Sequence, residues 1–84
     1  MKQEKPKTYT IIVNGREKEV ESEELSWREL ALLAFPNGQF GELIEYNITY
    51  SKGPKENREG TLVEGQTVTI KNRMNFHVKR TDRS

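Results

Sequence analysis

Residues 25–30 are Leu-Ser-Trp-Arg-Glu-Leu, and this stretch carries the start signal of a helix. Ser26 and Glu29 have the spacing of a capping box, in which each side chain accepts a hydrogen bond from a free backbone N–H of the first turn. Leu25 before the cap and Leu30 four residues after it match a hydrophobic staple. Apolar residues then recur at helical spacing up to Pro36, so the pattern predicts one helix of about ten residues.

The segment before this helix predicts a β-hairpin. Residues 9–13 are rich in β-branched and aromatic residues, as strands are. Asn14-Gly15 follows, and this pair suits a type I′ turn, which needs positive φ at both central positions. Residues 16–21 return as a polar strand with Val20 as its main apolar residue. We therefore expect this second strand at an edge of the sheet.

The segment after the helix predicts three more strands. Residues 46–50, 67–71 and 74–79 alternate apolar with polar side chains, and residues 51–60 form a polar loop. The order strand, strand, helix, strand, strand, strand predicts an α+β protein of the β-grasp type, with a mixed sheet of four to five strands covered by one main helix. We expect the strand after the helix to run parallel to the first. A ferredoxin-like fold would need a second helix, and a small barrel is disfavoured by the well-capped central helix.

Alternation also assigns the two faces of the sheet. One set of side chains should face the helix: Tyr9, Ile11, Val13, Tyr46, Ile48, Tyr50, Val68, Ile70, Met74, Phe76 and Val78. The opposite face is mostly polar, and a candidate partner-binding face there comprises Ile12, Asn47, Thr49 and His77. The alternative for His77 is an exposed strand histidine without a role. Trp27 has the helical spacing of a core residue rather than that of an exposed stacking platform.

Composition narrows the classes of function. The 84 residues suit one domain, and the absence of cysteine excludes disulfides, thiolate zinc sites and cysteine catalysis. A net charge of +1 gives no strong field toward nucleic acid or a membrane, and no apolar run approaches the roughly 20 residues of a transmembrane helix. We expect a cytoplasmic, non-enzymatic protein with no metal site and no catalytic residues. Residues 1–7 are expected to be a disordered tail, 8–79 the domain and 80–84 a flexible tail.

Five stretches carry a resemblance to a known family, namely residues 14–20, 32–38, 46–54, 60–65 and 76–84, and the most specific parts lie in three of them. Residues 32–38 are Leu-Leu-Ala-Phe-Pro-Asn-Gly, residues 60–65 are Gly-Thr-Leu-Val-Glu-Gly, and residues 81–84 are Thr-Asp-Arg-Ser. Together they resemble the bacterial ubiquitin-like proteins called multiubiquitin-domain proteins, over nearly the whole chain from about residue 8. The resemblance implies a protein modifier from a ubiquitination-like operon, several of which are linked to defence against phage. Its partners would be an activating enzyme, a conjugating enzyme, a deconjugating peptidase and target proteins.

The resemblance also implies roles for the last residues. The activating enzyme would use ATP and magnesium to adenylate the terminal carboxylate, and the modifier itself would need no cofactor. Ser84 would then be the conjugation terminus, and the tail that contacts the activating enzyme would comprise Lys79, Arg80, Thr81, Asp82 and Arg83. The chain departs from ubiquitin in lacking a Gly-Gly ending, whose missing Cβ atoms suit narrow enzyme tunnels. A non-conjugated interaction module, a sulfur carrier and one module of a longer protein are the alternatives.

Overall fold

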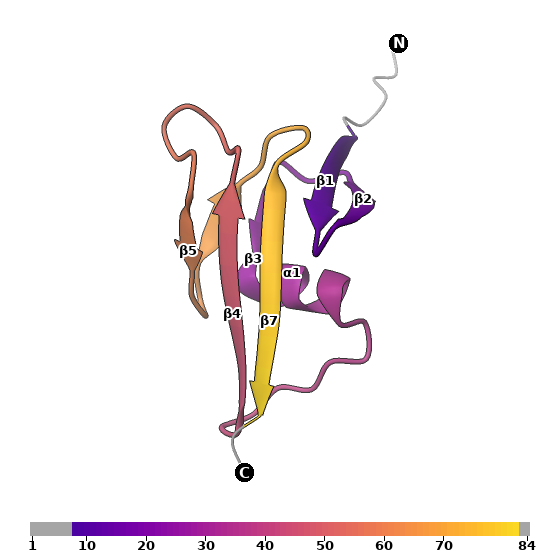
Figure 1. The fold of residues 1–84 in the computed structure, drawn as a ribbon, viewed down its shortest axis with the longest axis vertical. Coiled ribbons are helices and arrows are strands. Elements are labelled where there is room, and N and C mark those ends of the chain that lie inside the picture. Colours follow the sequence, from indigo (N-terminus) through magenta and orange to yellow (C-terminus); the bar gives the residue numbers. More distant parts are fainter. Residues whose placement is uncertain (1–7, 83–84) are drawn as a thin grey trace, which may run out of the picture.

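The computed structural model describes residues 8–82, which form a mixed five-stranded sheet with one helix packed against one face (Figure 1). The β-grasp fold predicted from the sequence is therefore confirmed. The expected disordered segment 1–7 lies outside the described residues. The elements in chain order are β1 (Tyr9–Val13), β2 (Arg16–Val20), β3 (Glu24–Ser26), α1 (Trp27–Ala34), β4 (Ile44–Ser51), β5 (Gly60–Leu62), β6 (Thr67–Thr69) and β7 (Asn75–Asp82).

The strand order of the main sheet is β2-β1-β7-β4-β5, and β3 pairs with β6 in a separate two-stranded sheet. β1 is antiparallel to β2 and parallel to β7, whereas β4 is antiparallel to both β7 and β5. The prediction that the strand after the helix runs parallel to β1 is wrong. β7 takes the position beside β1, so β4 pairs with the other edge of β7 and runs in the opposite direction to β1.

The helix start is the one predicted. The Oγ of Ser26 accepts a hydrogen bond from the Glu29 N–H at 3.1 Å, and Oε1 of Glu29 accepts one from the Ser26 N–H at 2.9 Å. The helix has eight residues, fewer than expected, because Pro36 disfavours helical geometry in the residue before it. Phe35 accordingly has φ −130° and ψ 83°, and its N–H donates the last helical bond, to the carbonyl of Ala31 at 2.8 Å.

The hairpin turn is also as predicted, and it does more than reverse the chain. Asn14 and Gly15 have φ of +53° and +82°, and Val13 pairs with Arg16 across the turn. The Asn14 side chain reaches β7: its Nδ2 donates to the Val78 carbonyl at 3.0 Å, and its Oδ1 accepts from the Val78 N–H at 2.8 Å. An amide side chain thus extends the β1–β7 pairing one step past the end of β1.

The predicted inner face forms the core. Ile11, Ile48, Met74 and Phe76 are fully buried or nearly so, while Tyr9 and Tyr50 are half-buried at its margin. Trp27 is only 6% exposed and is confirmed as a core residue. Its indole N–H donates to the Tyr46 carbonyl at 3.0 Å, so the one polar atom of the ring is satisfied.

The carboxyl end of the chain differs from the expectation. Residues 80–82 were expected to trail free, but β7 continues to Asp82 and pairs with β4 through Tyr46↔Arg80, Glu45↔Thr81 and Ile44↔Asp82. β4 begins at Ile44 rather than at residue 46, and this longer partner supplies backbone pairing to residues 80–82, which have no apolar side chains of their own. Arg83 and Ser84, the rest of the expected tail, lie outside the described residues.

Replacing Trp27 with Ala is expected to lower the free energy of unfolding by about 3–5 kcal/mol, because it opens a cavity where the indole ring packs in the core. Urea denaturation followed by circular dichroism measures the change. Trp27→Phe, which keeps an aromatic ring but loses the bond to Tyr46, should cost less. An unchanged denaturation midpoint in the alanine variant would contradict the placement of Trp27.

Replacing Asn14 with Gly keeps the positive φ of the turn but removes both hydrogen bonds to Val78. We expect a loss of about 1–3 kcal/mol, because the Val78 N–H and carbonyl lose their partners at a part-buried position. Asn37→Gly, at an exposed turn residue, is the matched control. Equal losses in the two variants would show that the side-chain bonds of Asn14 contribute nothing specific.

Candidate functional site

The predicted partner face is a contiguous surface on the side of the sheet away from the helix. On the antiparallel pair β4–β7, Thr49 lies opposite His77 and Asn47 lies opposite Lys79. All four side chains are exposed. Residues that face each other across two strands have neighbouring Cβ atoms, so these four form one polar patch, called here the outer-face patch.

Ile12 borders the outer-face patch from the neighbouring strand. It pairs with Asn75, two residues before His77, and is half-buried. On its other side Ile12 lies opposite Glu17 of β2, whose carboxylate is 3.9 Å from the Arg73 guanidinium. Both of these charged side chains are exposed, and an exposed pair of this kind contributes little stability. The predicted set of four residues is thus brought together on one face, with Ile12 at its margin.

The second half of β7 forms the other part of the candidate site. Arg80 and Asp82 are two residues apart on the same strand face, and Arg80 Nε donates to Asp82 Oδ1 at 2.8 Å. The hydrogen bond and charge of Asp82 raise the pKa of Arg80 above its ordinary value. Lys79 and Thr81 alternate with this pair and are exposed on the outer face.

The two halves of β7 have different surroundings. Its N-terminal half lies between β1 and β4, and the pairing with β1 ends at Val13↔Phe76, extended by Asn14 to Val78. From Lys79 to Asp82, β4 is the only strand among residues 8–82 that pairs with it. Figure 1 shows this end of β7 beside the start of β4, beyond the helix and far from the start of β1. The predicted tail residues Lys79 to Asp82 are therefore an exposed, one-sided strand end.

Sequence reasoning did not find the contact of Asn14 with β7. The Asn-Gly pair accounts for the turn by itself, so nothing local distinguishes an asparagine that also binds a strand 64 residues away. It also did not find the groove beside α1 described below, which is formed by segments that are separate in sequence.

Neither a metal centre nor a membrane helix is present in the part of the chain that the structure describes. Residues 8–82 contain no group of three or more His, Cys, Asp or Glu side chains able to hold a metal ion. No helix among them is long and apolar enough to cross a membrane. The sequence predicts no cofactor for the protein itself and ATP with magnesium for its partner enzyme, and neither expectation involves a residue of this surface.

Comparison of the sequence with known proteins identifies the family of the chain. Neither a curated protein nor a solved structure matches the chain. A family model described as multiubiquitin matches residues 9–82, which takes in every strand and the helix. With a β-grasp fold and a match of this extent, the chain belongs to the multiubiquitin family of ubiquitin-like domains.

Proposed function

We propose that this domain is a protein modifier whose carboxyl group, carried beyond β7, is activated by a partner enzyme and joined to a target protein. The observation that carries the proposal is the second half of β7. It projects past the helix, pairs with no strand of the described residues other than β4, and bears exposed Lys79 and Thr81. A strand end of this kind separates from its single neighbour at lower cost than a central strand does.

The chemistry belongs to the partner enzymes. The carboxylate attacks the α-phosphorus of ATP, bound with magnesium, and pyrophosphate leaves. A nucleophile then attacks the acyl carbon of the adenylate, and AMP leaves. In this proposal the modifier contributes the carboxylate of Ser84 and a surface that the enzymes recognise. A conjugating enzyme and a deconjugating peptidase complete the proposed set of partners, in a bacterial pathway of the antiphage type.

The outer-face patch is a candidate for the surface that the partner enzymes recognise. Asn47, Thr49, His77 and Lys79 are exposed and polar, and Lys79 is the first residue of the one-sided strand end. An enzyme that holds the end of β7 would therefore meet this patch next to its active site. Charged and polar side chains at the rim of such an interface act mainly on specificity and on the association rate.

The first test uses a purified activating enzyme from the operon that the proposal expects, with exchange of labelled pyrophosphate into ATP as the readout. The chain with a free carboxylate at Ser84 should support exchange. A chain extended beyond Ser84 should not, because its terminus is displaced. Deletion of residues 83–84, which leaves β7 intact, should weaken or abolish exchange. Exchange that is indifferent to all three termini would contradict activation at this end.

Conjugation is tested by expressing an N-terminally tagged chain with its neighbouring genes and blotting under denaturing conditions. Heavier bands that disappear in the extended chain indicate a conjugated modifier. A single band at the monomer mass, with the activating enzyme shown to be active, contradicts conjugation and favours a non-covalent interaction module. A monomer whose terminal oxygen is replaced by sulfur in the mass spectrum indicates a sulfur carrier instead.

A charge reversal tests the outer-face patch. Lys79→Glu should reduce activation by the enzyme with little change in the thermal midpoint, because the side chain is exposed and makes no ion pair in the described structure. Lys71→Glu, at an exposed lysine outside the patch, is the matched control and should leave activation unchanged. Equal behaviour of the two variants would exclude the patch from recognition.

A further inference from the structure

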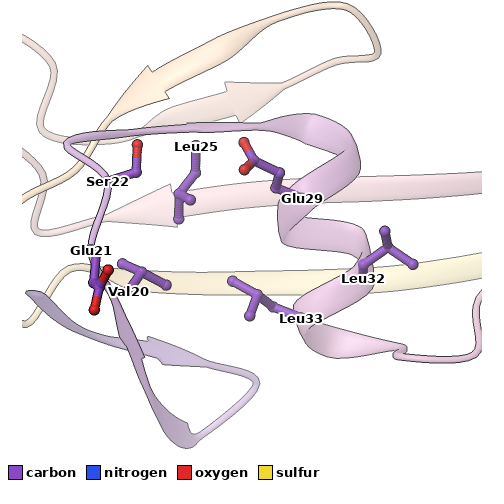
Figure 2. Close-up of a pocket in the computed structure, with 7 residues that line it drawn as sticks. All are labelled: Val20, Glu21, Ser22, Leu25, Glu29, Leu32 and Leu33. Carbon is purple, nitrogen blue, oxygen red and sulfur yellow. The ribbon is translucent and has the colours of Figure 1, made fainter.

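A groove lies between β2 and α1, on the inner side of the sheet and away from the outer-face patch. Its volume is about 490 Å³. Figure 2 shows Val20 of β2 and Leu33 of α1 pointing toward each other across it. Leu32, at the margin, is one of three large apolar side chains exposed among the described residues. The lining is Val20, Glu21, Ser22, Leu25, Glu29, Leu32 and Leu33.

The groove continues toward the hairpin turn. A second hollow of about 380 Å³ lies there, and Leu33 lines both. The lining of this second hollow is Val13, Asn14, Arg16, Lys18, Leu33, Ala34 and Pro36. The two hollows thus follow β2 from one end to the other, with apolar side chains along the middle.

The strand beside the groove has a free edge. β2 is the terminal strand of the main sheet, and within residues 8–82 no other strand pairs with its outer edge. In an antiparallel pair every second residue directs its N–H and carbonyl away from the partner strand, so β2 presents unpaired backbone groups along the groove. An extended segment can add to such an edge by backbone hydrogen bonds while alternate side chains enter a neighbouring hollow.

The two ends of the groove carry opposite charge. Glu21 and Glu29 line the end near β3, and Arg16 and Lys18 line the end near the turn. None of the four takes part in an ion pair within the described residues. A complementary occupant therefore carries a basic residue over the glutamates, apolar residues in the middle and an acidic residue over Arg16 and Lys18.

We infer that the edge of β2 and this groove bind an extended segment of a partner protein, basic at one end, apolar in the middle and acidic at the other. The five residues of β2 match an occupant of about five to six residues at roughly 3.3 Å each. This site goes beyond the proposed modifier function. It lies away from the end of β7, so a conjugated copy presents it as readily as a free one.

The test is selection of random twelve-residue peptides displayed on phage against the immobilised full chain. Enriched peptides should share alternating apolar residues with a basic and an acidic end, and a synthetic peptide should shift the backbone amide resonances of β2 and α1. The inference would be overturned if no peptide is enriched, or if the enriched peptides lack the charged ends. Resonance shifts confined to the outer-face patch would also overturn it.

Variants of the groove make the result specific. Glu21→Lys should lower the affinity for the selected peptide by about tenfold, as expected when one charge pair is lost and reversed. A peptide whose basic residue is replaced by Glu should bind the Glu21→Lys variant with the affinity regained. Leu32→Asp should also weaken peptide binding. Both positions are exposed, so the fold is retained.

The controls are Glu56→Lys and Leu43→Asp, at exposed positions outside the groove. Equal peptide binding by the groove variants and the control variants would contradict the site. Unaltered pyrophosphate exchange by the groove variants separates this site from the proposed activation at β7.

Discussion

The parallel pairing of β1 with β7 is the interaction on which the rest of the structure depends. It joins the first strand to the last: the Ile12 N–H donates to the Met74 carbonyl at 2.9 Å, and the Asn14 N–H donates to the Phe76 carbonyl at 3.0 Å. With β7 beside β1, β4 pairs with the far edge of β7. The helix then covers the apolar face that this arrangement assembles, and β2 and β5 become the outer strands.

The same pairing divides β7 into two parts with different roles. Up to Val78 the strand has neighbours on both sides and supplies the core residues Phe76 and Val78. From Lys79 to Asp82, where the described residues end, it pairs with β4 on one side and has no buried side chain. One strand therefore combines an anchored half, which stabilises the domain, with an exposed half that pairs with β4. Under the proposed function, this exposed half would lead the carboxyl end toward a partner enzyme while the core stays closed.

Local signals in the sequence predicted much of this fold. The capping box at Ser26, the Asn14-Gly15 turn and the alternation of the strands each depend on residues close in sequence, and all three were confirmed. The features that were missed depend on distant residues. The side chain of Asn14 binds Val78, the Thr10 N–H binds the side chain of Asn72, and residues 80–82 pair with an extended β4. The charged groove could not be predicted, because it forms only when β2 and α1 lie side by side in the fold. For the outer-face patch the sequence predicted only which residues share a face of the sheet, and for the strand end it predicted only a tail.

Residue-resolved hydrogen exchange along β7 tests the central claim most directly. The amides of Phe76 and Val78 lie on the side of β7 that faces β1 and Asn14, whereas the amides of Arg80 and Asp82 point to the same side after β1 has ended. The account predicts that Phe76 and Val78 exchange near the rate set by global unfolding and that Arg80 and Asp82 exchange much faster. Uniform protection from Phe76 to Asp82 would contradict a one-sided strand end and, with it, an accessible carboxyl terminus.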